Sequence, residues 1–477
     1  MEEKSEQVQE RYKNMEKMKA MGVDPFGGSW EGIEQIAFVK KDYKEARSSR
    51  IAGRIMARRM HGKSAFLDMK DFSGKMQVYL RKDVIGDEAF EILKTLDIGD
   101  IIGVSGELFK TRTGEDTVKV ESFVVLSKSL RPLPEKWHGL KDVETRYRQR
   151  YVDLIVNEEA QAKFKIRHEL ISNIRENLSR KGFLEVETPM MHPIPGGAAG
   201  KPFKTHHEAL DMDLYLRIAP EIYLKKLLVG GFEKIFEINR SFRNEGISTR
   251  HNPEFTMMEV YQAYSDCDGM MKLTEDIIRS SAKAILGKEK FSYQGKEVDL
   301  TVWKKVSFRR LMEENFGIKV EDPLSAWVDK LKAKGIEIEG NAVSKTQIIN
   351  IVGELVEPER ETHPVFVVDM FKELSPLAKE KKSEKGIADR FELYLGGMEI
   401  ANAYSELNDP IDQAKRFEEQ VKADPSAMVD RDFIRALEYG MPPAGGLGIG
   451  IDRLAMIFTD SASIREVILF PHMRPTD

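Results

Sequence analysis

The chain has 477 residues, of which 41% are hydrophobic and 32% are charged, and its formal net charge at pH 7 is −5. This balance is typical of a folded globular protein, and the length predicts about two or three domains because a single core rarely extends over so long a chain. The single Cys267 excludes an intramolecular disulfide framework and a multi-cysteine zinc site, and the acidic charge restricts any nucleic-acid contact to local basic patches.

The N-terminal segment, residues 1–49, is expected to form a helical extension and not a targeting sequence. Its charged start, MEEKSEQVQERYK, lacks the apolar core of a signal peptide. Apolar runs elsewhere, such as FVVL and VILF, are far shorter than a bilayer span. We therefore expect a cytoplasmic protein with no membrane segment.

A basic stretch follows between Arg50 and Lys82. It contains nine Lys or Arg residues against two Asp residues, a local excess of seven positive charges in an acidic chain. A solvated basic hairpin would explain this charge equally well. Strand alternation favours a binding surface, because it leaves Phe66, Gln77 and Tyr79 on the face opposite the apolar side chains. Exposed rings among cations hold single-stranded nucleotides by stacking, and a glutamine can hydrogen-bond a base edge.

Several short strands are expected between Arg50 and Leu126, separated by turn sequences such as FSGK and TGED. This pattern predicts a small five-stranded β-barrel of the oligonucleotide-binding (OB) type. We place the domain at residues 50–135, where two closely spaced prolines in RPLPEK indicate a stiff link to the next domain.

Residues 136–477 are predicted to form a larger α+β domain. Apolar side chains recur at helical spacing from about Asn157 to Lys181, and GFLEVETPM then predicts a strand that stops at Pro189. Beyond it, strands alternate with helices, which is typical of an antiparallel or mixed sheet flanked by helices. A mostly helical insertion is expected at about residues 268–361.

The segment FRNEGISTRHNPEF, which starts at Phe242, concentrates fixed charge beside an aromatic ring. Arg243 ends a predicted strand on its polar side, where the planar guanidinium can meet a carboxylate or a phosphate. Phe255, on the returning strand, offers a flat surface for a heterocycle. Guanidinium groups beside a ring suit a nucleoside triphosphate, and a structural loop of ion pairs is the alternative.

The segment DRFELYLGGMEIANAYSELND predicts a β-hairpin with Gly396 and Gly397 in a two-residue turn. That register pairs Glu392 with Ala401 and places Glu392 and Glu399 on one face as diagonal neighbours. Two such carboxylates repel each other unless a divalent cation bridges them, and Mg²⁺ is the natural candidate beside a triphosphate. A solvent-exposed acidic hairpin is the alternative.

The segment PPAGGLGIGIDRLAMIF combines closely spaced glycines with Arg453 at the start of an amphipathic helix. The glycines permit close backbone approach, and Arg453 could hold an anion; a packing helix that begins at a tight turn is the alternative. The glycine spacing does not match a dinucleotide-binding fingerprint. The sequence also contains no GxxxxGK[ST], HIGH, KMSKS or GxSxG motif, so ATP would have to bind by another architecture.

Together these segments resemble the three ordered motifs of the class II aminoacyl-tRNA synthetases, over nearly the whole chain. GFLEVETP resembles motif one, and FRNEG with RHNPEF resembles motif two. GLGIGIDRLAM resembles motif three, with Asp452 where the class more often has Glu. The resemblance implies a homodimer with Pro189 at its interface.

The resemblance also implies roles for the charged residues. Arg243 would bind the α-phosphate and the amino-acid carboxylate, and Arg453 would stack on the adenine opposite Phe255; Arg243 and Arg453 would be the catalytic residues. The implied ATP-binding residues are Arg243, Glu245, Arg250, His251, Phe255, Glu392 and Arg453. The implied metal ligands are Glu392 and Glu399, for about one to three Mg²⁺ ions per subunit.

The implied amino-acid pocket is rich in acidic side chains, which suits a substrate with two ammonium groups. Its members would be Gly197, Glu221, Arg243, Glu259, Tyr261, Asn402, Tyr404 and Glu406. Glu221 also begins a helix. The alternative to a substrate-binding role is therefore a first-turn carboxylate that only interacts with the helix dipole. Because the aspartyl and asparaginyl relatives have glutamine there, Glu221 favours the lysine-specific branch. Strict alternation separates Asn402, Tyr404 and Glu406 from Glu399, so a bulge near Ala401 would be needed.

The resemblance therefore implies an enzyme that uses ATP to join L-lysine to the 3′ end of tRNA(Lys) through a lysyl-adenylate. The OB barrel would bind the anticodon through Phe66 and Gln77, with Arg58 or Arg59 nearby. Two alternatives remain at this point. One is an aspartyl or asparaginyl enzyme, and the other is a synthetase-like regulatory protein that binds RNA without catalysis.

Overall fold

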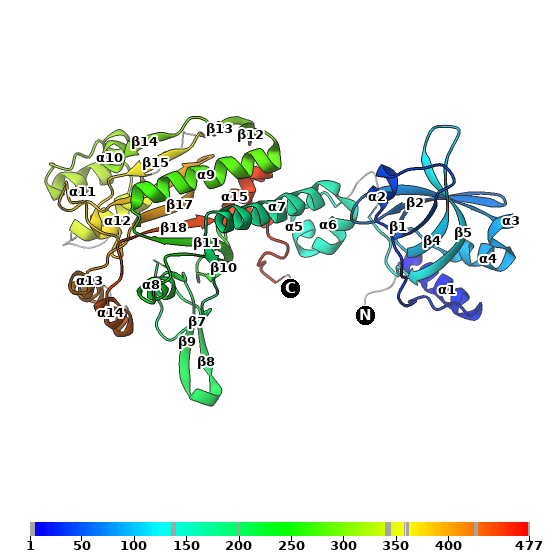
Figure 1. Ribbon diagram of the computed structural model, residues 1–477, viewed down its shortest axis with the longest axis horizontal. Coiled ribbons are helices and arrows are strands. Elements are labelled where there is room, and N and C mark those ends of the chain that lie inside the picture. Colours follow the sequence, from blue (N-terminus) through cyan, green and yellow to red (C-terminus); the bar gives the residue numbers. More distant parts are fainter. Residues whose placement is uncertain are drawn as a thin grey trace. The chain divides into compact units, whose positions relative to one another are not determined.

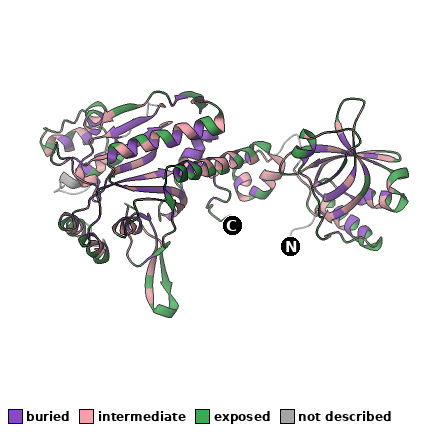
Figure 2. Cartoon of the chain, in the orientation of Figure 1, coloured by how far each residue is buried: buried purple, intermediate pink, exposed green. Residues whose placement is uncertain are grey.

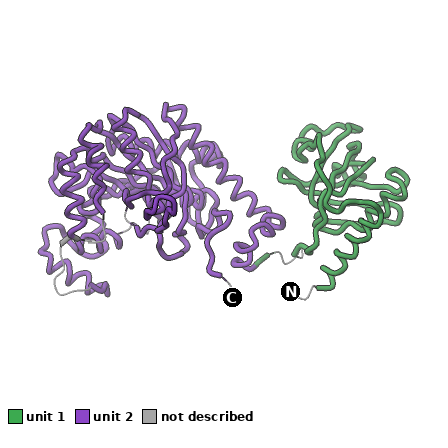
Figure 3. The backbone as a smooth tube through the Cα atoms, turned by 90° about the horizontal axis from the view of Figure 1, so that it is seen from below, with its two compact units in different colours: residues 1–141 green, residues 142–477 purple. Residues whose placement is uncertain are grey.

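The computed structural model describes residues 5–134, 140–198, 200–338, 345–356, 358, 362–423 and 428–475. The chain divides into two compact units, Met1–Lys141 and Asp142–Asp477, which are described separately (Figure 3). The predicted boundary at residues 135 and 136 and the last residue of the predicted insertion, Glu361, lie outside or at the edge of the described residues. None of the helices in the described ranges combines the length and the apolar character needed to cross a lipid bilayer.

The N-terminal unit is a five-stranded β-barrel with short helices around it (Figure 1). Its elements are α1 (Glu6–Ala20), α2 (Ile36–Lys41), β1 (Ser48–His61), β2 (Ser64–Lys70), β3 (Lys75–Arg81), α3 (Lys82–Ile85), α4 (Asp87–Thr95), β4 (Ile101–Lys110) and β5 (Asp116–Ser127). The strands close in the order β1-β2-β3-β5-β4, which confirms the predicted barrel. Alternate side chains such as Leu67 and Val78 are fully buried inside it.

The second unit begins with helices and continues as an α+β fold. Its elements up to the central strands are α5 (Val143–Arg148), α6 (Arg150–Val156), α7 (Glu158–Arg180), β6 (Leu184–Glu185), β7 (Met191–His192), β8 (Lys204–His207), β9 (Met212–Leu216), α8 (Glu221–Val229), β10 (Lys234–Phe242), β11 (Glu254–Ala263) and α9 (Cys267–Leu286). Helix α7 confirms the helix predicted from Asn157 to Lys181, which are its two capping residues. The strand predicted before Pro189 is only the two-residue β6.

The remaining elements complete the sheet and add helices at its margin. They are β12 (Lys290–Tyr293), β13 (Lys296–Asp299), β14 (Lys304–Ser307), α10 (Phe308–Phe316), α11 (Leu324–Ala333), α12 (Lys345–Leu355), β15 (Val365–Val368), β16 (Arg390–Leu395), β17 (Met398–Ser405), α13 (Pro410–Ala423), α14 (Arg431–Glu438), β18 (Ala444–Gly450) and α15 (Ile451–Phe458). Three 3₁₀ turns are η1 (Glu208–Leu210), η2 (Lys372–Leu374) and η3 (Ile464–Glu466).

A central eight-stranded sheet organises this unit, in the order β14-β15-β16-β17-β18-β11-β10-β6. The strands from β15 to β10 pair antiparallel, and only the edge strands β14 and β6 pair parallel. The sheet is therefore mixed, with the predicted antiparallel part at its centre.

The two faces of the central sheet have different partners. Helices α9 and α15 pack on one face, and α7 packs against both helices (Figure 1). Met258 and Val260 on β11 are buried in the core beneath these helices, whereas Glu259 and Tyr261 alternate with them and lie on the other face. Figure 2 shows that the strands of this sheet are mostly buried. The face without these helices therefore carries the polar side chains of the site.

Helices α10, α11 and α12 pack into a second, smaller core, which contains Phe308, Trp327 and Ile348 and is shared with strands β15 and β16. Helix α9, by contrast, contributes Met270 and Ile277 to the main core. The part of the predicted insertion that has a separate core therefore begins after the β12–β13 hairpin, because the apolar face of α9 is used by the central sheet.

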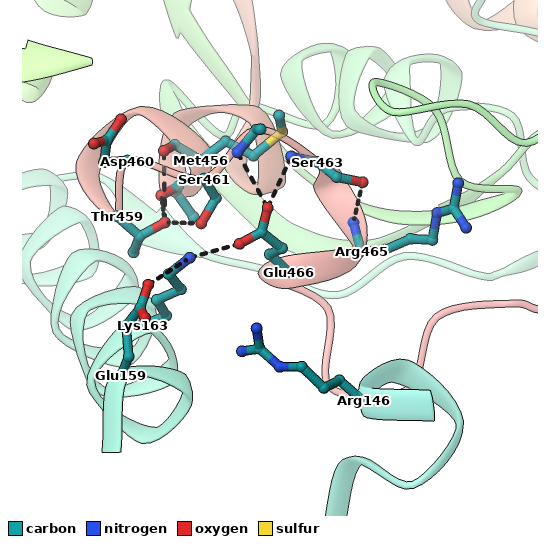
Figure 4. A network of polar contacts seen from close by, with 12 residues as sticks. Arg146, Glu159, Lys163, Met456, Thr459, Asp460, Ser461, Ser463, Arg465 and Glu466 are labelled. Carbon is teal, nitrogen blue, oxygen red and sulfur yellow. Dashed lines mark hydrogen bonds and ion pairs between the residues drawn. The ribbon is translucent and has the colours of Figure 1, made fainter. Parts of the chain in front are cut away.

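Polar contacts tie the C-terminal segment to α7 (Figure 4). Lys163 Nζ lies 2.5 Å from Glu466 Oε2 and 3.4 Å from Glu159 Oε1. Glu466 also forms a capping box with Ser463 at the start of η3. These contacts fix the chain where it leaves α15, the helix that carries Arg453.

Candidate active site

The face of the sheet opposite α9 and α15 borders a cleft of about 1700 Å³. Its lining includes nearly all of the residues that the sequence assigns to ATP, metal and amino acid: Gly197, Glu221, Arg243, Glu245, Arg250, His251, Phe255, Glu259, Tyr261, Glu392, Glu399, Asn402, Tyr404 and Arg453. Residues from five strands and helices and the loops between them, up to 256 positions apart in sequence, thus meet at one place. Glu406 is the exception, because it does not line the cleft.

Arg243 lies at the end of β10, with its guanidinium carbon 5.2 Å from the centre of the Phe255 ring. Its Nε is buried and has no hydrogen-bond partner among the described residues. Burial lowers the pKa of Arg243, and the nearby carboxylates of Glu245 and Glu399 oppose this shift. A buried guanidinium with an unused donor is suited to bind an anionic ligand.

A second cation lies close by, on α15. Arg453 Nη1 donates to the backbone oxygen of Glu399 at 2.8 Å and lies 3.5 Å from its carboxylate, while Nη2 lies 3.0 Å from His251 Nε2. His251 Nδ1 lies 2.9 Å from Ser248 Oγ. Burial, followed by the charge of Arg453, lowers the pKa of His251, so this imidazole is neutral at pH 7.

The hairpin β16–β17 has the predicted turn, since Gly396 and Gly397 have φ of 61° and 74°. The predicted partner of Glu392 was wrong: Glu392 pairs with Asn402, and Leu393 pairs with Ala401. The register shifts because a bulge leaves one extra residue between Glu399 and Ala401.

This bulge removes the conflict between strict alternation and the predicted amino-acid pocket. It brings Asn402 and Tyr404 to the same face as Glu399, as the half-buried positions along β17 show. Glu392 and Glu399 also remain on one face, as predicted. The expected bulge near Ala401 is therefore present, and one strand contributes both to the carboxylate pair and to the amino-acid pocket.

The carboxylate pair suits a hard divalent cation that also binds phosphate. Both groups offer oxygen ligands in the cleft that Arg243 and Arg453 share, which is the chemistry that Mg²⁺ prefers. Glu392 Oε1 accepts from Arg390 Nη2 at 2.6 Å, and Glu392 Oε2 accepts from Tyr394 at 3.1 Å. No group of three or more His, Cys, Asp or Glu side chains that could hold a metal ion is found in the described ranges.

The other end of the cleft is acidic. Glu221, at the first turn of α8, is buried, and its Oε2 accepts a hydrogen bond from the Tyr404 hydroxyl at 2.7 Å. Gly197 adjoins it, since a Cβ built on Gly197 would lie 3.2 Å from Glu221 Cβ. The backbone at Gly197 therefore adjoins the Glu221 side chain.

Glu259 is the second acidic group in this part of the cleft. It accepts a hydrogen bond from the Tyr261 hydroxyl at 3.0 Å and makes no ion pair with any described residue. Burial, reinforced by the charge of Glu221, raises the pKa of Glu259 to about 8. A buried carboxyl group that stays protonated because it has no cation beside it is suited to bind a cationic ligand.

Glu406 is buried and is not among the residues that line the cleft. It forms an ion pair with Lys225, a fully buried residue of α8 whose Nζ also lies 2.6 Å from Glu221 Oε1. The carboxylate of Glu406 lies over Gly446, on the face of the sheet that also carries Tyr261 and Tyr404. A Cβ built on Gly446 would lie only 1.8 Å from Glu406 Oε1 and 2.7 Å from Tyr261 Cε1.

Replacing Gly446 by alanine should therefore disrupt the acidic end of the cleft. We expect the affinity for lysine to fall by about tenfold or more, because the added methyl group must displace the buried Glu406 carboxylate or the Tyr261 ring. Calorimetric titration with lysine in the absence of ATP measures the effect. Gly450→Ala is the matched control on β18, since its Cβ would have no neighbour closer than 3.7 Å, and equal losses in both variants would contradict the prediction.

Sequence reasoning missed several residues that support the site. Lys225 is one, although its spacing of four residues from Glu221 on a predicted helix is a recognisable signal. Arg390 is another. Asp452 accepts from Arg167 Nη2 at 2.6 Å and from the backbone nitrogen of Thr256 at 2.7 Å, which explains an acidic residue there. The contact with Arg167 joins distant segments and has no signal in the sequence.

The candidate nucleic-acid surface lies on the outer face of β1, β2 and β3. Phe66 and Tyr79 were expected as exposed rings, but each is half-buried. The two rings stack on each other, with their centres 4.5 Å apart. Arg59 pairs with Phe66 across the strands and lies 2.9 Å from Asp68. Gln77 shares this face.

The structure distinguishes the two arginines that the sequence left as alternatives for this surface. Arg58 pairs with Leu67, whose side chain is inside the barrel, and its guanidinium bonds to the backbone oxygen of Leu96. Arg59 is therefore the arginine that shares the face of the aromatic pair.

Comparison with known families agrees with this arrangement. Residues 142–474 match the family model of class II tRNA synthetases (D, K and N), and residues 50–126 match that of the OB-fold nucleic acid binding domain. The first match covers the unit that contains the cleft, and the second covers all but the ends of the barrel strands.

The chain is also similar over its full length to several lysine–tRNA ligases. It is 53% identical to that of Carboxydothermus hydrogenoformans over 487 residues, which is 100% of this chain and 99% of the relative. It is 53% identical to that of Pelotomaculum thermopropionicum over 489 residues, which is 100% of this chain and 96% of the relative. The lysine–tRNA ligase of Thermotoga maritima is 48% identical over 483 residues, which is 98% of this chain and 96% of the relative. The chain therefore belongs to the class II tRNA synthetases, in the group that the family model describes as D, K and N.

Proposed function

We propose that the chain joins L-lysine to the 3′ end of tRNA(Lys), using ATP and forming a lysyl-adenylate, for protein synthesis. The observation that carries the proposal is that one cleft places the guanidinium groups of Arg243 and Arg453 next to the carboxyl groups of Glu221 and Glu259. The relatives at 48% to 53% identity, all named lysine–tRNA ligases, support the same substrate. ATP–pyrophosphate exchange tests it, and lysine alone among lysine, aspartate and asparagine should support exchange.

The guanidinium end of the cleft is the proposed ATP site. Arg243 holds the α-phosphate and the amino-acid carboxylate, and Phe255 and Arg453 enclose the adenine. Arg250 and His251 face the outer phosphates, and Glu245 meets the adenine amino group. The unused donor of Arg243 supports its role.

The acidic end is the proposed lysine site. Glu221 and the backbone of Gly197 bind the α-ammonium group, and Glu259 with Tyr261 binds the side-chain ammonium group. Asn402 and Tyr404 complete the lining, and the buried Glu406 adds its charge. The raised pKa of Glu259 supports this arrangement, because a bound ammonium group favours the ionised carboxylate.

Glu392 and Glu399 are the proposed ligands of Mg²⁺. When bound there, the ion supplies positive charge to the phosphate oxygens. The chain's own contribution is to hold two carboxylates on one hairpin face and to keep Arg453 next to Glu399, at 2.8 Å from its backbone oxygen.

The reaction needs position and charge but no side-chain nucleophile. The lysine carboxylate attacks the α-phosphorus of ATP in line, and pyrophosphate leaves. Arg243 stabilises the charge that develops on the phosphoryl oxygens. The 3′-hydroxyl of the terminal tRNA adenosine then takes the lysyl group, and AMP leaves. Cys267, the one thiol, takes no part, since it is buried and burial raises its pKa.

The N-terminal barrel is proposed to bind the anticodon through Phe66, Gln77 and Arg59, with Arg58 nearby, bonded to the backbone oxygen of Leu96. We expect Phe66→Ala to weaken tRNA binding by about tenfold, since stacking of one base on an aromatic ring contributes about 1 to 3 kcal/mol. Lysine-dependent exchange without tRNA should not change. Phe72→Ala is the control, because Phe72 is 75% exposed and lies outside the stacked pair; equal loss in both variants would contradict the assignment.

The proposed assembly is a homodimer with Pro189 at the interface. Pro189 is exposed, and exposed apolar side chains adjoin it at Leu184, Met190 and Met191, which supports a covered surface. A cytoplasmic location, and the division into an extension at 1–49, an anticodon-binding domain at 50–135 and a catalytic domain at 136–477, remain parts of the same proposal.

A further inference from the structure

Lys225 is a buried cation to which the mechanism so far gives no role. It lies on α8, its side chain is fully buried, and its Nζ contacts Glu221 Oε1 at 2.6 Å and pairs with Glu406. The Tyr404 ring centre lies 5.5 Å from the same nitrogen. A lysine is rarely buried so completely unless its charge is paired.

The two carboxylates that Lys225 joins occupy different positions. Glu221 lines the cleft beside Gly197, whereas Glu406 is buried over Gly446, on the same face of the sheet but outside the lining. Lys225 fixes one oxygen of Glu221 and the Tyr404 hydroxyl fixes the other, so the carboxylate has one orientation. Each oxygen has a second lone pair, so Glu221 can still accept from a ligand.

The charges at this end of the cleft can be counted. Glu221, Glu259 and Glu406 supply up to three negative charges, and Lys225 supplies one positive charge, which leaves two. Lysine presents two ammonium groups. Burial lowers the pKa of Lys225, but Glu221 and Glu406 raise it further, so the net pKa lies above the ordinary value and the group is an ammonium ion at neutral pH.

We propose that Lys225 is a positioning residue of the lysine site: its ammonium group orients Glu221 toward the substrate and cancels the charge of Glu406, so that two carboxylates face a substrate with two ammonium groups. The inference rests on the proposed lysine pocket and goes beyond it, because it makes a residue outside the cleft lining a determinant of lysine binding.

Lys225→Met tests the role, since methionine keeps the length of the side chain and removes its charge. We expect the KM for lysine in pyrophosphate exchange to rise by about thirtyfold or more, because truncating one partner of a buried charge pair costs at least that much. The KM for ATP should stay within about twofold. Lys226→Met is the matched control on α8, because Lys226 pairs with Asp432 and does not line the cleft.

Chemical rescue separates charge from volume. Lys225→Ala removes three carbons and the ammonium group, which propylammonium replaces atom for atom, whereas 1-propanol has similar size without charge. Propylammonium should lower the KM for lysine of this variant, and 1-propanol should not. Equal rescue by the two compounds, or an equal rise in the KM values for lysine and ATP, would overturn the inference.

Glu259→Gln, measured in parallel, distinguishes the two proposals. If Glu259→Gln raises the KM for lysine and Lys225→Met does not, the lysine pocket stands and the role of Lys225 is overturned. If neither variant changes this KM, the pocket assignment itself is wrong. Circular dichroism and thermal unfolding of each variant establish that the KM values come from folded protein.

Discussion

Replacing Arg243 by lysine is expected to lower lysine-dependent pyrophosphate exchange by about a hundredfold to a thousandfold. The Arg243 guanidinium lies over the Phe255 ring at 5.2 Å and has a buried Nε without a partner among the described residues. A lysine ammonium group keeps the charge but cannot present two parallel donors to a phosphate and a carboxylate. The loss should fall on the rate of exchange more than on the KM for lysine.

Arg240→Lys is the matched control for this prediction. Arg240 lies on the same strand, β10, but its guanidinium is partly exposed and contacts Glu254 at 3.5 Å, and it does not line the cleft. We expect its exchange rate to remain near that of the unchanged protein. A similar loss in both variants would show that the effect comes from the strand and not from the position of Arg243 in the cleft.

Glu399→Gln is the second substitution expected to have a large effect, and it should abolish pyrophosphate exchange. The change keeps the size of the side chain but removes a negative charge from the pair on β16 and β17, which lowers its affinity for a divalent cation. Anticodon binding should not change, because that surface belongs to the other unit. Filter binding of tRNA and exchange at rising Mg²⁺ concentrations measure both properties.

Glu254→Gln provides the comparison for Glu399→Gln. Glu254 lies at the start of β11, where its partners are Arg240 and His472, and it does not line the cleft. We expect Glu254→Gln to keep exchange. Normal exchange by Glu399→Gln itself would remove Glu399 from the metal site.

The sequence predicts the repeating elements of this fold well, because each depends on local periodicity. Helix α7 begins and ends within one residue of its predicted limits, and the Gly396–Gly397 turn has the expected positive φ angles. The five barrel strands follow from alternation between apolar and polar residues. Periodicity did not predict α3 and α4, which lie between β3 and β4 in the sequence.

The candidate site is less predictable, because its geometry depends on pairing between distant segments. Charge and ring positions in the sequence are sufficient to select Arg243, Phe255 and the hairpin carboxylates. Local alternation shows that the pocket needs a bulge after Glu399. It does not show that the bulge forms, because the registers with and without it differ by only one residue. The position of Glu406 depends on Lys225 and Gly446, which lie on other elements, so its burial over Gly446 is visible only in three dimensions.

Calorimetric titration of the chain with lysine, without ATP and in buffers of different ionisation enthalpy, tests the central claim most directly. Because the pKa of Glu259 is raised to about 8 in the free site, this carboxyl is protonated at pH 7, and a bound ammonium group must release the proton. Lysine binding should release up to about 0.9 proton per site at pH 7 and strengthen as the pH rises toward 8. Aspartate should not bind. Binding of aspartate as tightly as lysine, or lysine binding with no proton release, would contradict the account.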